Sequence, residues 1–238
     1  MSVLGHRLRA YVRPEGFDPL TAFAWTAVYW ANDPGWSNPG DGGTVTTWRD
    51  GSGNGYTGTA TGSPIYRATH AGLNNKAIVE CTVDSVASSN FSSAISQPYS
   101  MVIIADDIIG EAVWTRVMST GAHEVNGRIM KQPDGSLVLN TSGYDYPAIN
   151  VSDTESVLLS ALFSGSSSYA VKNGTASGTV NPGTGTAANI TVCNDSGGGA
   201  AHTEKVAFAG VFAGDFHTEP NYAAFKSWVA SYYGLTIA

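Results

Sequence analysis

Short apolar runs separated by turn-forming residues recur along most of the chain. About ten runs are rich in Val, Ile, Thr and aromatic residues, and clusters of Gly, Pro, Asn and Ser separate them. The expected strands are 44–50, 77–83, 99–105, 112–119, 127–132, 136–141, 157–164, 168–176, 188–194 and 206–214. Run 99–105 is apolar at almost every position, as a strand buried on both faces would be. This pattern predicts an all-β sandwich or barrel.

Three shorter segments are interpreted from their local sequence. Residues 20–31 are apolar and aromatic, and they fit either a short helix or a buried strand. Asp134-Gly135 predicts a hairpin turn of the primed type between runs 127–132 and 136–141. Asp106-Asp107 follows run 99–105 and predicts a turn at the end of that strand.

One amphipathic helix is expected at the C-terminus, over residues 219–233. Its apolar stripe repeats at helical spacing and consists of Phe225, Trp228, Val229 and Tyr232. Thr218 is the expected N-cap, Pro220 fits the first turn, and Gly234 is the expected C-cap. The stripe predicts a helix packed on the sandwich, with a partner-binding helix as the alternative.

Composition and charge exclude several functional classes. Charged residues make up 13% of the chain and the net charge is −7, so the clustered cations of a nucleic-acid-binding protein are absent. No run is long and apolar enough for a transmembrane helix, and no apolar core of a secretory leader follows the N-terminal charges. We therefore expect no nucleic-acid or membrane partner, and synthesis in the cytoplasm without a signal peptide.

The first residues differ in charge from the rest of the chain. Arg7, Arg9 and Arg13 precede every acidic residue, while the other nine basic residues face nineteen acidic ones. We expect an N-terminal arm over residues 1–17 and one domain over residues 18–238. The arm is either a solvated terminus or a docking segment for an acidic partner, in which case these three arginines make the contact.

The two cysteines, Cys81 and Cys193, both lie in strand-like runs. Two cysteines are too few for a disulfide framework, and their spacing matches no zinc site. We expect buried, reduced and inert thiols. A single long-range disulfide is the alternative.

Residues for catalysis are not grouped in the sequence. A glycosidase of this architecture needs paired carboxylates facing one side, and the nearest candidates are Glu80 and Asp84, without a third carboxylate. The five histidines are scattered and none forms a metal pair at short spacing. We therefore expect a protein that binds rather than catalyses.

Two loop regions carry candidate ligand-binding residues. Asp33, Asp41 and Asp50, with Asn54, lie in two glycine-rich loops whose oxygens suit calcium, although Asp and Asn are also ordinary turn residues. No other cofactor is expected. Exposed rings stack on sugars, which makes Trp36, Tyr144 and Tyr146 candidates beside Asp41, Asp50 and Asn54; the alternative is that the rings fill the core and the loop bases.

The stretch WRDGSGNGYTGTATGSPIY (48–66) makes the fold prediction more specific. It resembles the W-x-D-x-SGNG signature of LamG-like, concanavalin A-like jelly-roll domains. Later pieces follow in the order of that family: LNNKAIVECTVDS, QPYSMVIIA, SYAVKNGTASG and the closing YAAFKSWVASYYGLTIA. The resemblance spans about residues 20–238 and implies a two-sheet antiparallel jelly-roll sandwich with a short C-terminal helix.

Domains with this blend of features are similar to virion proteins of tailed bacteriophages. The resemblance implies a non-enzymatic minor tail protein, located in the virion, that binds other virion proteins and a host-surface glycan. It also implies more than one copy in the particle. A capsid decoration protein and a free carbohydrate-binding lectin are the alternatives, and a glycan hydrolase is disfavoured.

Overall fold

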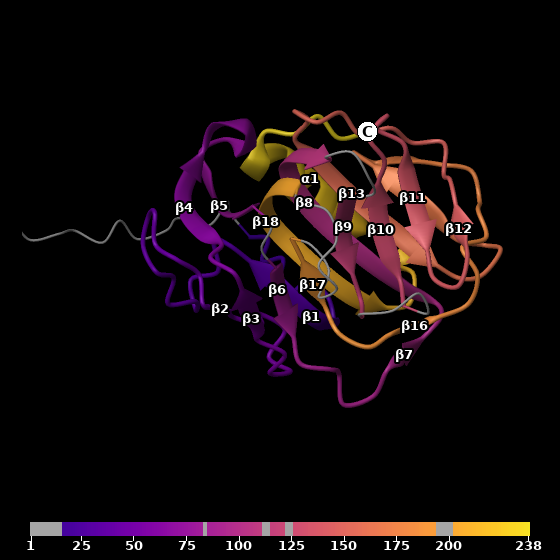
Figure 1. Ribbon diagram of the computed structural model, residues 1–238, viewed down its shortest axis with the longest axis horizontal. Coiled ribbons are helices and arrows are strands. Elements are labelled where there is room, and N and C mark those ends of the chain that lie inside the picture. The colour runs from indigo at the N-terminus through magenta and orange to yellow at the C-terminus, as the bar shows by residue number, and fades with distance from the viewer. Residues whose placement is uncertain (1–15, 83–84, 111–114, 122–125, 194–201) are drawn as a thin grey trace, which may run out of the picture.

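The computed structural model is a two-sheet antiparallel sandwich with one α-helix on its outside (Figure 1). It describes residues 16–82, 85–110, 115–121, 126–193 and 202–238. Within these residues, no helix has the length and apolar character required to cross a membrane. The predicted jelly-roll sandwich is confirmed.

The first sheet, sheet A, has the strand order β15-β14-β13-β8-β18-β5-β4. Strand β1 lies outside this order and also pairs with β18, at residues beyond those that pair with β5. Its strands are β1 (Trp25–Trp30), β4 (Ile65–His70), β5 (Lys76–Thr82), β8 (Tyr99–Gly110), β13 (Val157–Phe163), β14 (Tyr169–Lys172), β15 (Thr175–Ala176) and β18 (His202–Ala213). The segment 20–31, which fitted a helix or a strand, thus contains strand β1.

The second sheet, sheet B, has the order β12-β11-β10-β9-β17-β6-β3-β2. Its strands are β2 (Thr47–Trp48), β3 (Gly58–Thr61), β6 (Ser85–Ser88), β9 (Thr115–Ser119), β10 (Arg128–Lys131), β11 (Leu137–Asn140), β12 (Tyr144–Asp145) and β17 (Thr191–Val192). A small third sheet pairs β7 (Ile95–Ser96) with β16 (Thr186–Ala187).

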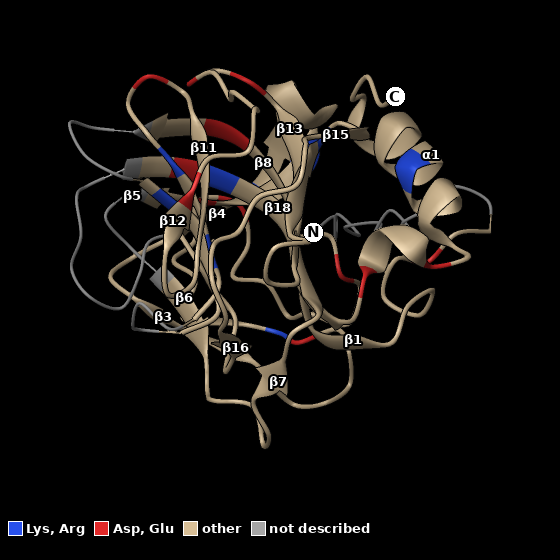
Figure 2. Ribbon diagram, turned by 90° about the vertical axis from the view of Figure 1, so that its right-hand side faces the viewer, with Lys and Arg blue, Asp and Glu red and all other residues tan. Residues whose placement is uncertain are grey.

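The core has two layers because sheet A is buried on both faces. Alternate residues of β8 point to opposite faces of sheet A. Met101 and Ile103 face sheet B, whereas Val102 and Ile104 belong to the cluster under the C-terminal helix. Figure 2 shows α1 (Tyr222–Tyr233) on the side of sheet A away from β6, β11 and β12. The continuous apolar run 99–105 correctly indicated a strand covered on both sides.

The helix begins later than predicted. A 3-10 turn, η2 (Phe216–Thr218), comes directly before it, and Asn221 is the N-cap residue of α1. Another 3-10 turn, η1 (Ala71–Leu73), lies between β4 and β5. The Thr218 hydroxyl donates to the carbonyl of Asp215 instead of capping α1, because the chain turns through η2 first. Gly234 ends the helix at φ 73°, as predicted, and the stripe residues Phe225, Trp228, Val229 and Tyr232 are buried.

Two turn predictions need correction. Strands β10 and β11 do form a hairpin, but the Gly135 amide donates to Gln132 and only Gly135 has positive φ, so the turn is not of the primed type. Asp106 and Asp107 lie inside β8, at a bulge where Asp107 has φ 48°. The strand continues there because β18 is equally long and its Lys205 forms an ion pair with Asp107.

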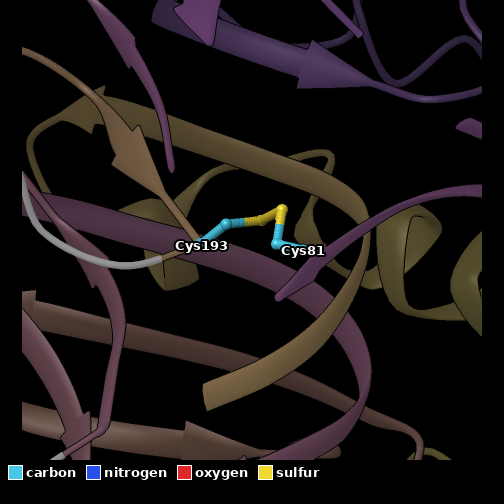
Figure 3. Close-up of a disulfide and its surroundings, with 2 residues drawn as sticks. All are labelled: Cys81 and Cys193. Carbon is cyan, nitrogen blue, oxygen red and sulfur yellow. A yellow bond between two sulfur atoms is a disulfide. The ribbon is translucent and has the colours of Figure 1, made fainter. Parts of the chain in front are cut away.

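Cys81 and Cys193 form a disulfide, so the prediction that both are reduced is wrong (Figure 3). Cys81 lies in β5 of sheet A, and Cys193 directly follows β17 of sheet B. The two Cα atoms are 5.7 Å apart, within the range that a disulfide spans. The facing strand positions of the two sheets, which a single sequence does not show, bring the sulfurs together.

The boundary of the N-terminal arm stays a prediction. Residues 1–15, including Arg7, Arg9 and Arg13, lie outside the described residues. Phe17, at the end of the predicted arm, packs its ring 6.0 Å from Trp228 and 6.4 Å from Phe23. The chain is therefore attached to the helix layer from Phe17 onward.

Candidate functional site

The glycine-rich loop after β2 is organised by the buried carboxylate of Asp50. That carboxylate accepts hydrogen bonds from the amides of Val28 (3.1 Å), Ser52 (2.9 Å) and Tyr56 (3.0 Å) and from the Ser52 hydroxyl (2.8 Å). A carboxylate with this many donors folds the loop back on β1. Asp50 therefore holds the loop, and its oxygens are occupied by protein donors.

Asn54 fixes the tip of the same loop. Its side-chain amide donates to the carbonyls of Trp25 and Thr26, both at 3.0 Å. The residue itself is exposed, so the loop tip lies on the start of β1 with one face open to solvent. Asn54 is the one predicted ligand residue that lines a surface pocket in this loop.

An open pocket of about 620 Å³ lies between this loop, the start of β1 and the loop around Phe91. We call it the Tyr56 pocket; its lining residues are Phe23, Ala24, Trp25, Thr26, Ser52, Asn54, Tyr56, Phe91, Ser92 and Ser93. None of these side chains is charged. Ligand pockets of this size combine aromatic surface with a few polar groups in the same way.

Tyr56 connects the two loops of the pocket. Its ring centroid lies 4.8 Å from that of Phe91, and its hydroxyl oxygen is 2.9 Å from both the Ser92 hydroxyl and the Ser92 amide nitrogen. Hydrogen bonds with the Ser92 side chain and backbone lower the pKa of Tyr56. The partly exposed ring is thus held rigidly, with neutral hydrogen-bonding groups around it.

The structure separates the other predicted ligand residues. Trp36 is only 7% exposed, stacks on Trp48 at 5.7 Å and donates through its indole nitrogen to the Thr47 carbonyl, so it offers no free ring face. Tyr144 and Tyr146 are 51% and 50% exposed. They lie at β12, at the opposite edge of sheet B from β2, so they cannot share a site with the loop at 50–56.

The candidate calcium residues are not brought together either. Asp33 is buried, accepts from the Gly35 amide and pairs with Arg49. Asp41 is exposed and accepts from the Ala68 amide at 3.0 Å. With Asp50 committed to its own loop, each carboxylate is used locally, and no metal cluster contains them within the part of the chain that the structure describes.

A different group, His70, Asp106 and Asp107, has metal-ligand atoms within 4.8 Å of one another. These residues already form hydrogen bonds and ion pairs with one another and with neighbouring side chains. His70 Nε2 bonds to Asp106, whose other oxygen accepts from Ser156 at 2.8 Å, and Asp107 pairs with Lys205. Figure 2 shows the acidic stretch of β8 beside the basic stretch of β18. A cation would have to displace these partners.

A serine, a histidine and an aspartate also align between sheet A and η2. Ser160 Oγ is 2.8 Å from His217 Nε2, and His217 Nδ1 is 2.9 Å from Asp215 Oδ1. Burial lowers the pKa of His217, against the opposing effect of Asp215. Ser160 is only 2% exposed, and the chain of bonds attaches η2 to β13. Of the candidate hydrolase pair, Glu80 forms an ion pair with Arg67, and Asp84 lies outside the described residues.

No protein-family model and no curated protein matches this sequence. Solved structures do match its fold. Domain 4 of AbnA, a GH43 extracellular arabinanase from Geobacillus stearothermophilus, in complex with arabinotriose, has a TM-score of 0.58 and 15% identity. The match covers 88% of this chain and 98% of that chain.

Botulinum neurotoxins supply further matches. The binding domain of neurotoxin DC in complex with rat synaptotagmin II has a TM-score of 0.61 and 10% identity, over 86% of this chain and 52% of that chain. A structure of botulinum neurotoxin type C, whose cell entry depends on interaction with two ganglioside molecules, has a TM-score of 0.54 and 10% identity. This match covers 78% of this chain and 51% of that chain. The chain spans about half of these neurotoxin chains. At such identities the likeness shows the fold, a jelly-roll sandwich that these glycan- and receptor-binding domains share.

Proposed function

We propose that this chain is a non-catalytic glycan-binding domain that binds a neutral sugar in the Tyr56 pocket. The observation that carries the proposal is the pocket itself: a rigid aromatic ring beside uncharged hydroxyl and amide groups. Such a lining offers stacking for a sugar face and hydrogen bonds for its hydroxyls. Two structural matches support this ligand class: one contains arabinotriose, and the other is a neurotoxin whose cell entry depends on ganglioside molecules.

Replacement of Tyr56 by alanine tests the pocket. On an array of neutral glycans, the wild-type chain should bind at least one sugar class, and Tyr56→Ala should weaken that binding at least about tenfold, which corresponds to about 1.4 kcal/mol. Tyr56→Phe keeps the ring but loses the bonds to Ser92, so it should bind with intermediate affinity. Circular dichroism should show that all variants fold.

Tyr146→Ala is the matched control, because Tyr146 is an exposed tyrosine at the opposite edge of sheet B. It should leave neutral-glycan binding unchanged. If Tyr146→Ala abolishes binding while Tyr56→Ala does not, the sugar binds at β12 and the pocket assignment is wrong. Release of reducing sugar from any bound glycan would contradict the non-catalytic part of the proposal.

The domain's proposed setting is the virion of a tailed bacteriophage, as a minor tail protein present in more than one copy. The support is the resemblance of segment 48–66 and the segments after it to such proteins, and the cationic start of an otherwise acidic chain. A capsid decoration protein would have the same features in another part of the particle. A free lectin would bind glycans without a particle.

Deletion of residues 1–15 tests docking through the arm. The deletion keeps Phe17, whose ring contacts Trp228, so the melting temperature should not change. The full chain should co-sediment with intact phage particles, and the shortened chain should not. Binding of the full chain should weaken as salt rises, since screening reduces attraction between exposed charges. Equal co-sedimentation of both chains would contradict docking through the arm.

A further inference from the structure

A row of polar side chains crosses the outer face of sheet B. Directly paired residues of neighbouring strands point to the same face. The pairs Thr191–Ser119, Ser119–Arg128, Arg128–Asn140 and Asn140–Tyr144 connect β17, β9, β10, β11 and β12. The alternate row, Val192, Met118, Ile129 and Leu139, lies in the core between the sheets, so the polar row faces outward.

Arg128, at the centre of this row, is a buried cation that forms no ion pair with a carboxylate of the described residues. The residue is 3% exposed, and its side chain makes no hydrogen bond or ion pair with any residue that the structure describes. Other recessed cations are paired: Lys131 with Asp153, and Lys205 with Asp107. A guanidinium stays charged at every physiological pH, so burial without a partner is strongly unfavourable.

The neighbours of Arg128 leave further binding capacity on the same face. Asn140 is 1% exposed; its amide nitrogen donates to the Gly143 carbonyl, while its Oδ1 has no partner among the described residues. Arg116 is opposite Met130, one step along the same face. Burial and then the charge of Arg128 lower the pKa of Arg116.

The row opens to solvent at one end. Tyr144 on the edge strand β12 is 51% exposed, whereas Asn140, its partner on β11, and Arg128, one strand further in on β10, are buried. A ligand entering from this edge would meet an aromatic ring first, then an amide oxygen, then a guanidinium. This order suits a sugar ring that carries an acidic group.

We infer that the outer face of sheet B binds the carboxylate of an acidic sugar, with Arg128 as its partner. The planar guanidinium accepts a carboxylate through two parallel hydrogen bonds. Arg116 adds positive charge, Asn140 Oδ1 accepts from a sugar hydroxyl, and Tyr144 packs against the ring at the open edge. This site is at the other end of sheet B from the Tyr56 pocket and does not depend on the neutral-glycan proposal.

The test compares the wild-type chain with Arg128→Met, using glucuronic acid, glucose and sodium sulfate at matched ionic strength. Glucuronic acid should raise the melting temperature of the wild type and glucose should not. Arg128→Met should melt at the same or a higher temperature without ligand, because methionine removes an unpaired buried charge without removing a partner. Titration calorimetry should show glucuronic acid binding at least about tenfold weaker to the variant.

Two further variants refine the result. Arg128→Lys keeps the charge but loses the two-pronged geometry, so it should bind glucuronic acid with intermediate affinity. Arg67→Met removes an exposed arginine that pairs with Glu80 on sheet A, and it should bind like the wild type. Arg128→Met should retain any neutral-glycan binding at Tyr56, so the two proposals can fail separately.

Three outcomes would overturn the inference. If Arg128→Met melts well below the wild type without ligand, Arg128 is held by groups of the protein itself. If sulfate stabilises the wild type as much as glucuronic acid does, the site takes a free oxyanion and the sugar assignment is wrong. If no acidic probe changes the melting temperature of the wild type, no such site exists.

Discussion

Replacement of Trp228 by alanine should lower the free energy of unfolding by about 3–5 kcal/mol, the cost of removing a large aromatic side chain from a packed core. Trp228 is 3% exposed and lies at the centre of the layer between α1 and sheet A. Its ring packs against Trp30 at 5.8 Å, Phe208 at 6.3 Å and Tyr232 at 5.2 Å.

Urea denaturation followed by circular dichroism measures this loss. Ser227→Ala is the matched control, because Ser227 is exposed in the same helix and its hydroxyl only donates to the Ala223 carbonyl. That variant should change stability by less than about 0.5 kcal/mol. A loss below about 1 kcal/mol for Trp228→Ala would mean that the helix layer contributes little to the fold.

The fold was predictable because burial follows local patterns. The alternation that places Met101 and Ile103 on one face and Val102 and Ile104 on the other requires only residue types in order. The helix stripe around Trp228 is equally local. The continuation of β8 through Asp106 and Asp107 was not predictable, because the groups that compensate these charges, His70 and Lys205, are distant in the sequence.

The candidate sites were less predictable for the same reason. The glycine-rich loop was identified, but the role of Asp50 depends on the Val28 amide, 22 residues away. Tyr56 and Phe91 meet only after folding, and Phe91 stands in a serine-rich segment that resembles an ordinary loop. The polar row on sheet B depends on strand register, which aligns Arg128 with Asn140 and Ser119.

Reduction of the Cys81–Cys193 disulfide should destabilise the chain by about as much as the loss of Trp228. The bond closes a loop with a sequence separation of 112 residues. In the chain-entropy model, opening a loop of this size stabilises the unfolded state by about 4–5 kcal/mol. For a domain of this size, that change lowers the melting temperature by about 10 °C or more.

The mechanism is specific to the position of the bond. Cys81 is 1% exposed in β5 and Cys193 is buried beside β17, so the disulfide joins sheet A to sheet B inside the core. Reduction leaves two thiols that still pack as small apolar side chains. The folded state therefore loses little contact, and the effect comes from the greater freedom of the unfolded chain.

Calorimetry with and without reductant measures the shift, and mass spectrometry of the unreduced protein should show a deficit of two hydrogens. The double variant Cys81→Ala, Cys193→Ala is the control: it should melt near the reduced wild type and should not respond to reductant. A melting temperature of the wild type that is insensitive to complete reduction would contradict the entropic role of the bond. Absence of the two-hydrogen deficit would instead mean that Cys81 and Cys193 are free thiols and that no disulfide joins the two sheets.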